Sequence, residues 1–187
     1  MMTNPLIRLL SLLTLGLFTN LALSAEPLTT GDKIAAALKD ERRSTAEVDR
    51  DRNRKPLETL KFFRLKDDMT VLEIMPGGGW YTNILGPVLA ERGRLLLTIG
   101  AERTAERLIG QPGFESTELI PFDRSNISRS TTSRAMIMPA FSLGVKKVDL
   151  ALTFRNLHNL TPESRQHMNE AVFDTLKKGG LYGVVDH

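Results

Sequence analysis

The stretch that decides the fold is Thr-Val-Leu-Glu-Ile-Met-Pro-Gly-Gly-Gly-Trp-Tyr-Thr-Asn-Ile-Leu, residues 70–85. Residues 71–74 form a short apolar run, interrupted by Glu73, of the kind that a buried strand shows. Three glycines, Gly77 to Gly79, follow at once, and an amphipathic segment begins at Tyr81. Such a strand, glycine loop and helix start let a ligand approach the backbone and meet free N–H groups. The stretch predicts a nucleotide-type site, although any tight strand-to-helix turn also recruits glycine.

Apolar segments of strand length alternate with helical segments from residue 56 onward. Further strands are expected at Leu95–Ile99, Thr117–Pro121, Val148–Phe154 and Leu181–Val185. Helices are expected from Pro56, from Tyr81, over Ala101–Ile109 and after the cap Thr161. Asp32 is expected to cap an earlier helix, and Lys177 to Gly180 to end the last one. This alternation indicates a parallel sheet with helices on both faces.

The N-terminus has the order of a secretory signal. Arg8 is the only charged residue before Glu26, Leu9–Leu23 is almost continuously apolar, and small residues follow. We therefore predict a signal peptide over residues 1–25, cut after Ser24 or Ala25. A retained membrane anchor is the alternative, but a span needs roughly 20 apolar residues. The mature protein is expected to be periplasmic or secreted, touching a membrane only through this segment.

The rest of the chain reads as one domain, residues 56–187, behind a polar and helical extension, residues 26–55. The net charge of +3 is spread along the chain and gives no reason to expect nucleic-acid binding. With no cysteine, an exported domain must be stable without disulfides. The densely charged run 40–55 is read either as a solvated face or as a segment folded over the glycine site. In the second reading the contributing residues would be Arg50, Asp51, Arg54 or Lys55.

Ligands of parallel α/β sheets bind at the carboxyl ends of the strands. The residues expected at those ends are Glu73, the three glycines, the stretch after Ile99, Asp123, Arg155 to His158, and Asp186. We expect them to converge on one crevice. A dinucleotide site would need the spacing Gly-x-Gly-x-x-Gly, and the third glycine is missing here. The carboxylate of Glu73 suits a cationic ligand better, and S-adenosylmethionine carries a sulfonium and an ammonium but no phosphate.

These residues resemble a known family. The Glu73-x-x-x-Gly77-Gly78-Gly79 stretch is similar to the first motif of class I S-adenosylmethionine-dependent methyltransferases. More closely, residues 40–187 resemble a family of exported, predicted methyltransferases. The matching blocks are Asp49–Phe63, Pro76–Thr82, Thr153–Asn159 and Lys178–His187.

The resemblance implies a Rossmann-like three-layer αβα sandwich with about five mainly parallel strands in the order 3-2-1-4-5, preceded by N-terminal helices. It implies S-adenosylmethionine as cofactor, with contacts from Glu73, Gly77, Gly78, Gly79, Tyr81, Glu102, Asp123, Arg155 and Asn156. Three departures stand out. Met75 occupies the first motif glycine, Ile99 and Gly100 stand where an acidic residue binds ribose, and the final antiparallel strands are missing.

The function expected from this resemblance is methyl transfer to a small-molecule acceptor. His158 is the candidate general base, because its ordinary pKa lies near neutrality; a histidine that satisfies a loop carbonyl is the competing interpretation. A binding module of the same fold without turnover is the alternative function. The spacing of the glycines disfavours a third possible function, that of an NAD-dependent oxidoreductase.

His158, His167 and His187 show no metal-ligand spacing, so no metal site is expected. An exposed edge at the fifth strand predicts self-association.

Overall fold

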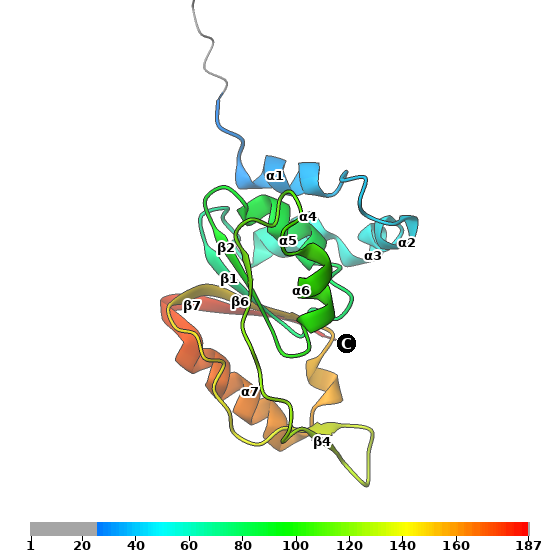
Figure 1. Ribbon diagram of the computed structural model, residues 1–187, viewed down its shortest axis with the longest axis vertical. Helices are drawn as coiled ribbons and strands as arrows, with labels where there is room; N and C mark the ends of the chain where they lie inside the picture. The colour runs from blue at the N-terminus through cyan, green and yellow to red at the C-terminus, as the bar shows by residue number, and fades with distance from the viewer. Residues whose placement is uncertain (1–25, 187) are drawn as a thin grey trace, which may run out of the picture.

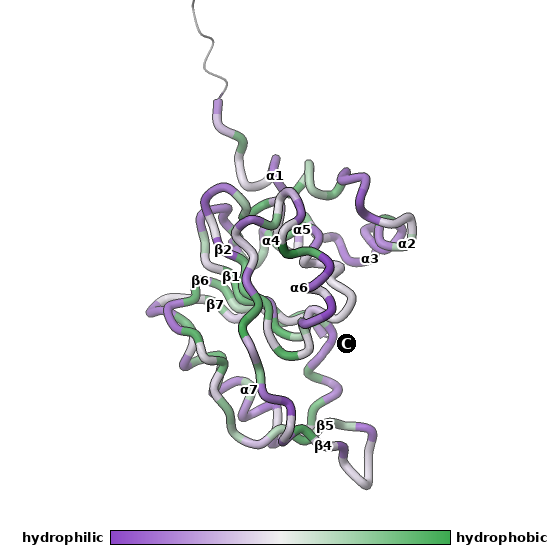
Figure 2. Tube along the Cα trace, in the orientation of Figure 1, coloured by the Kyte–Doolittle hydropathy of each residue, from purple (hydrophilic) through white to green (hydrophobic). Residues whose placement is uncertain are grey.

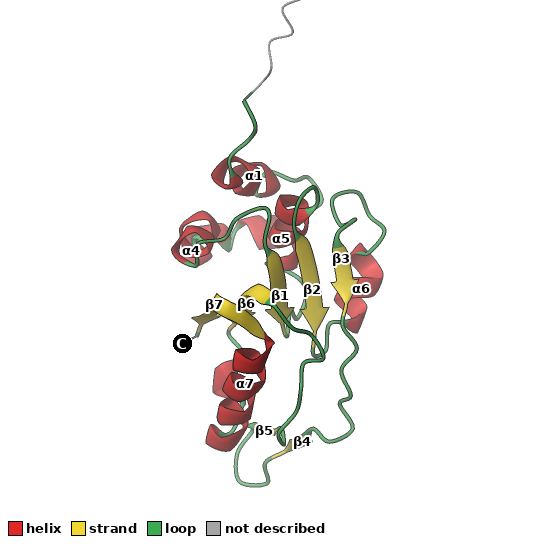
Figure 3. Ribbon diagram, turned by 90° about the vertical axis from the view of Figure 1, so that its left-hand side faces the viewer, coloured by secondary structure: helices red, strands yellow, loops and turns green. Residues whose placement is uncertain are grey.

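A parallel five-stranded sheet forms the centre of the protein, and its strand order is β3-β2-β1-β6-β7 (Figure 3). The computed structural model describes residues 26–186, so the predicted signal peptide lies outside the described residues. The strands are β1 (Thr70–Ile74), β2 (Arg94–Thr98), β3 (Thr117–Leu119), β6 (Val148–Phe154) and β7 (Leu176–Val185). The predicted parallel sheet and its order are confirmed, with β6 and β7 as the fourth and fifth strands.

Helices cover both faces of the sheet (Figures 1 and 3). They are α1 (Thr30–Ala37), α2 (Thr45–Val48), α3 (Asp51–Arg54), α4 (Pro56–Phe62), α5 (Thr82–Leu89), α6 (Glu102–Leu108) and α7 (Pro162–Thr175). Successive residues of β1 point to opposite faces: Val71 packs in a core with α1, α4 and α5, and Leu72 in a core with α7. The central strands are accordingly hydrophobic and the α2–α3 segment hydrophilic (Figure 2).

Local signals placed most helix starts correctly. Pro56 is the first residue of α4, and Thr161 caps α7, both as expected; Ser44 and Glu47 form a capping box at the start of α2. The cap of α1 is an exception. Thr29 is the N-cap, and Asp32 completes its capping box from the third helical position, so the expectation that Asp32 caps this helix was wrong.

The end of α7 differs from the expectation too. The helix ends at Thr175, and β7 begins at once with Leu176. Residues 177–180 therefore do not terminate the helix. They form an irregularity inside β7, where the register against β6 shifts between Val148 and Leu150. Gly179, at φ +79°, supplies the left-handed backbone that this irregularity needs.

The polar excursion between β3 and β6 contains a small antiparallel pair, β4 (Ser128–Arg129) and β5 (Met136–Ile137). After β5 the chain runs over the start of α7, where the Met138 N–H donates to Ser164 Oγ at 2.8 Å. Among residues 26–186, no helix has the length and apolar character needed to cross a membrane.

Candidate functional site

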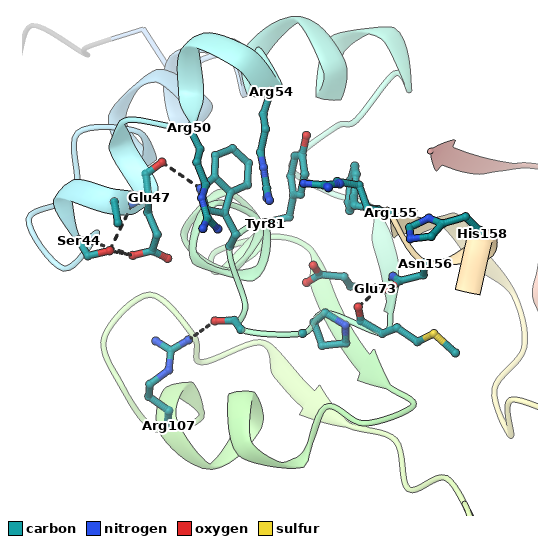
Figure 4. Close-up of a pocket in the computed structure, with 17 residues that line it drawn as sticks. Ser44, Glu47, Arg50, Arg54, Glu73, Tyr81, Arg107, Arg155, Asn156 and His158 are labelled. Carbon is teal, nitrogen blue, oxygen red and sulfur yellow. Dashed lines mark hydrogen bonds between the residues drawn. The ribbon is translucent and has the colours of Figure 1, made fainter. Parts of the chain in front are cut away.

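A cavity of about 550 Å³ lies at the carboxyl ends of β1 and β6, within the size range of small-molecule sites. Its wall comes from four places: the α2–α3 segment, the loop after β1, helix α6 and the loop after β6 (Figure 4). The lining residues are Ser44, Ala46, Glu47, Arg50, Arg54, Glu73, Met75, Pro76, Gly77, Gly78, Trp80, Tyr81, Arg107, Phe154, Arg155, Asn156 and His158.

The glycine loop faces open space at its first two residues and contacts α6 at its third. A Cβ built on Gly77 or Gly78 would meet no atom within 4 Å, so the backbone there faces open space in which a ligand fits. A Cβ on Gly79 would stand 2.8 Å from Thr104 Cγ2 and 2.9 Å from Arg107 Nη2, so glycine is required there for the close approach of α6. α6 also binds the loop, since Thr104 Oγ1 donates to the Gly77 carbonyl and Arg107 Nη2 to that of Gly78.

Three neighbouring strands end in the same unusual backbone conformation. The residue directly after each of β1, β2 and β6 has a positive φ without being glycine: Met75 at +54°, Ile99 at +53° and Arg155 at +61°. Each such residue costs of the order of 1–3 kcal/mol and persists only where surrounding structure enforces it. Met75 thus adopts a left-handed conformation that glycine would adopt without strain. These three strained residues lie along the edge of the sheet where the cavity opens.

Glu73 lies at the base of the cavity, with only 2% of its surface exposed. Its Oε2 accepts a hydrogen bond from Thr82 Oγ1, in the first turn of α5, at 2.7 Å. Burial raises the pKa of Glu73 to about 7, and the Thr82 hydrogen bond opposes that rise only in part. A carboxyl group with a pKa near neutral pH is ionised when a cationic ligand binds beside it, because the ligand's positive charge stabilises the carboxylate. Glu73 is therefore suited to bind a cation.

The α2–α3 segment forms one wall of the cavity and is held there by hydrogen bonds to the start of α5. Trp80 Nε1 donates to the Glu47 carbonyl oxygen at 3.0 Å, and Asn83 Nδ2 donates to Glu47 Oε1 at 2.7 Å. Arg43, buried behind this wall, bonds both carboxylate oxygens of Asp51. The charged run is therefore not only a solvated face, as one reading of the sequence had it.

Of the four residues named in the other reading, two line the cavity. The Arg54 guanidinium carbon lies 4.4 Å from the centre of the Trp80 ring, a cation–π contact, and Arg50 lies beside it in Figure 4. Asp51 instead pairs with Arg43, and Lys55 does not line the cavity.

Asn156 joins the ends of two strands. Its Nδ2 donates to the Met75 carbonyl oxygen at 3.1 Å and to Thr153 Oγ1 at 2.9 Å, while Thr153 Oγ1 donates to the Ile74 carbonyl at 3.1 Å. These bonds hold the loop after β6 against the glycine loop. Asn156 therefore both lines the cavity and fixes its shape.

His158 lies in the 3-10 turn Leu157–Asn159 and faces the cavity from the loop after β6. Its Nδ1 is 2.5 Å from Asp186 Oδ1, and its backbone N–H donates to Asp186 Oδ2 at 2.8 Å. With Asp186 accepting at Nδ1, the neutral ring carries its proton there, so Nε2 is the ring's acceptor nitrogen. This arrangement suits a general base.

Most of the site residues expected from the sequence meet at this cavity, and two do not. Glu73, Gly77, Gly78, Tyr81, Arg155, Asn156 and His158 line it, and Gly79, the last glycine of the same loop, faces α6. Glu102, at the exposed start of α6, and Asp123, which caps its own loop through Ser125, stand outside its wall. The sequence did not single out Arg107, Trp80 or Glu47, and it placed Asp186 at the sheet edge without pairing it to His158.

Among residues 26–186, no group of three or more potential metal-ligating side chains comes together. By sequence, no protein-family model matches the chain, and no protein with a curated function does.

Solved structures do match the fold. A SAM-dependent methyltransferase from Aquifex aeolicus gives a TM-score of 0.52 at 20% identity, over 83% of this chain and 72% of that one. Coclaurine N-methyltransferase bound to N-methylheliamine and SAH gives 0.52 at 12% identity, over 77% and 36%. DhpI, solved as a SAM–HEP complex, gives 0.50 at 19% identity, over 82% and 62%. At these identities the likeness is one of fold: the chain has the Rossmann-like architecture of class I SAM-dependent methyltransferases.

Proposed function

We propose that this protein is an S-adenosylmethionine-dependent methyltransferase that acts on a small-molecule acceptor. The observation that carries the proposal is that the open backbone at Gly77 and Gly78 lines the same cavity as the buried carboxylate of Glu73, at the carboxyl end of β1. The glycines leave room for a ligand to lie against the loop. The carboxylate favours the positive groups of this cofactor and disfavours a pyrophosphate.

The cavity also offers partners for the rest of the cofactor. The methionyl carboxylate would find arginines on the cavity wall, and Tyr81 provides an aromatic surface close to the loop. When bound, the cofactor would supply a sulfonium-activated methyl group, which passes to an acceptor atom with a lone pair while the C–S bond electrons return to sulfur.

The chain's own contribution would be mainly positional, as in other transfers to an activated group. The loop after β6, held by Asn156, would fix the acceptor's place relative to the glycine loop. His158, with Nε2 as the acceptor nitrogen, would take the proton that the acceptor atom loses.

Calorimetry on the folded chain tests the proposal with three ligands: S-adenosylmethionine, S-adenosylhomocysteine and NAD. We expect the two sulfur ligands to bind and NAD not to. If neither sulfur ligand binds a protein whose circular dichroism shows the folded state, the proposal is wrong.

Gly78→Val is the matched variant for this test. Its added side chain meets no protein atom near the Cβ position, so the thermal unfolding midpoint should stay close to that of the wild type. The same side chain would occupy the ligand's space, and we expect affinity for S-adenosylhomocysteine to fall by about tenfold or more, the scale of a filled contact position. Unchanged affinity would place the ligand elsewhere.

A binding module without turnover is the second candidate. It is favoured by one observation: no carboxylate from the end of β2 lines the cavity, since Glu102 stands outside it. Binding of both sulfur ligands with no methyl transfer across a panel of acceptors would support the module over the enzyme.

A further inference from the structure

A second cavity of about 440 Å³ adjoins the first and shares part of its wall. The shared residues are Arg50, Arg54, Tyr81, Phe154 and Arg155; Asn53, Val185 and Asp186 complete the second cavity. In Figure 4 Arg54 reaches down from α3 and Arg155 across from the loop after β6, with Tyr81 beside them. A molecule in this second space would lie next to one bound at the glycine loop.

Three guanidinium groups surround this junction without carboxylate partners. Within residues 26–186, the guanidinium groups of Arg50, Arg54 and Arg155 make no ion pair and no hydrogen bond; at Arg54 only the backbone carbonyl oxygen accepts a side-chain hydrogen bond, from Thr59 Oγ1. Two carboxylates close to the junction bond other groups: Asp51 bonds Arg43, and Asp186 bonds His158.

Arg54 feels the positive charges of its two neighbours. Burial lowers the pKa of Arg54, and Arg50 and Arg155 lower it further, while Tyr81 and Asp51 oppose the shift in part. Arg54 is half-buried, whereas Arg50 and Arg155 are exposed at the cavity mouth, so all three guanidinium groups are accessible to a ligand. Planar guanidinium groups bind carboxylate and phosphate oxygens in a forked geometry, and an anion at this junction would offset the charge that the three share. The stacked face of Arg54 on Trp80 leaves the edge of its guanidinium to make such bonds.

The proposed cofactor does not supply enough negative charge for this wall. It brings one carboxylate together with two positive groups. The first cavity already has four arginines against the two glutamates Glu47 and Glu73. Arg107, bonded to the Gly78 carbonyl, stands at the opposite end of the cavity in Figure 4, so the excess positive charge lies on the side of the second cavity.

The same junction has an aromatic pair in its wall. The rings of Tyr81 and Phe154 are stacked, with centroids 3.5 Å apart and an interplanar angle of 11°, and both line the two cavities. We propose that the methyl acceptor is a small organic anion: its carboxylate or phosphate binds Arg50, Arg54 and Arg155 in the second cavity, and its apolar part lies against Tyr81 and Phe154. This inference rests on the proposed methyltransferase function.

The test uses the full chain saturated with S-adenosylhomocysteine, whose own binding is measured first. Benzoate, phenyl phosphate and the neutral isostere benzamide are then titrated by calorimetry. We expect at least one of the two anions to bind about tenfold or more tightly than benzamide, as charge-assisted hydrogen bonds predict. The stronger of the two anions identifies the acceptor's acidic group. Equal affinity for all three probes would overturn the inference and leave the methyltransferase proposal standing.

Competition separates an acceptor site from the cofactor's own carboxylate site. If the anion binds in the presence of saturating S-adenosylhomocysteine, the two ligands form a ternary complex, as we expect. If it binds only to the ligand-free protein and is displaced, the arginines serve the cofactor and the inference is wrong. Failure of S-adenosylhomocysteine to bind at all would instead contradict the proposed function.

Arg50→Gln and Arg52→Gln form a matched pair, with the same change in charge two residues apart. Arg52 is exposed on α3 and lines neither cavity. Arg50→Gln, and equally Arg155→Gln, should weaken anion binding by about tenfold, whereas Arg52→Gln should leave it unchanged. Equal losses in the pair would show a general charge effect instead of a site, and would overturn the inference.

Discussion

Both carboxylate oxygens of Asp186 bind His158: Oδ1 lies 2.5 Å from the ring Nδ1, and Oδ2 accepts the backbone N–H at 2.8 Å. The end of β7 therefore orients a side chain in the loop after β6. Such a two-point contact fixes both the ring's rotation and its tautomer.

The first prediction concerns that tautomer. At a pH where the ring is neutral, nitrogen-15 NMR of the full chain should show the proton of His158 on Nδ1. Asp186→Ala removes the acceptor, so the proton should redistribute toward Nε2. His167, whose Nδ1 contacts the Met138 carbonyl oxygen, serves as the internal control, because its signals should not move. A His158 tautomer unaffected by Asp186→Ala would mean that the carboxylate does not set it.

The second prediction is a pH dependence of stability that comes from Glu73. Its pKa rises from 4.5 to about 7 on folding, so between these values the folded state binds more protons than the unfolded state. The free energy of unfolding therefore falls as pH rises from about 4.5 to 7, by about 3 kcal/mol for this group. Glu73→Gln does not titrate and should gain stability relative to the wild type across that window.

Urea unfolding at pH 5, 6, 7 and 8 measures this difference, which should grow with pH and level off above 7. Glu102→Gln, at an exposed carboxylate, is the control and should follow the wild type at every pH. A constant offset between Glu73→Gln and the wild type would show that Glu73 does not have the raised pKa.

The third prediction tests the left-handed backbone at Met75. A β-branched residue is poorly compatible with φ +54°, so Met75→Val should lower the free energy of unfolding by about 1–3 kcal/mol. Met75→Gly adopts this conformation freely, and its relief of strain offsets the loss of side-chain contacts and the entropy of glycine. We expect it to stay within about 1 kcal/mol of the wild type. Chemical unfolding measures the free energy of unfolding of the two variants. If Met75→Val were the more stable of the two, the left-handed conformation of Met75 would be contradicted.

The sequence predicted the sheet well because its strands are buried. Val148–Phe154 is bounded by polar residues, and the structure reproduces that strand to the residue. The start of β7 was missed, because two lysines followed by glycines look like a helix end, whereas Gly179 serves a register shift.

The sequence predicted where the site lies better than it predicted which residues line it. The rule that ligands bind at strand ends gives the correct edge, but not the direction of each side chain, and Asp123 turns back to Ser125. Arg50 and Arg54 reach the cavity only because Trp80 and Asn83 hold the α2–α3 segment in place. Such long-range contacts leave no periodic signal in the sequence.

The fourth prediction concerns the outer edge of the sheet, where we propose that the protein self-associates. In the described sheet β7 pairs with β6 on one side only, and Leu181 and Val184 are each 36% exposed. An apolar edge strand is a template for pairing with a second copy. Sedimentation velocity should show association that rises with concentration and is reduced in Val184→Lys. A monomer at all concentrations, with no difference between the two proteins, would contradict the proposal.

The fifth prediction concerns the other tyrosine of the chain. Tyr182 lies on β7 with its hydroxyl buried and, among the described residues, without a hydrogen-bond partner, and burial raises its pKa to about 12. An unsatisfied buried hydroxyl destabilises the folded state, so Tyr182→Phe should raise the free energy of unfolding by about 1 kcal/mol. Tyr81→Phe is the matched control: its hydroxyl is hydrogen-bonded to Thr59, so the same change should lower stability there. Urea unfolding of both variants at pH 7 measures the two signs. A loss of stability in Tyr182→Phe would mean that its hydroxyl has a partner in solution, and the packing of β7 against the α7 face would have to differ accordingly.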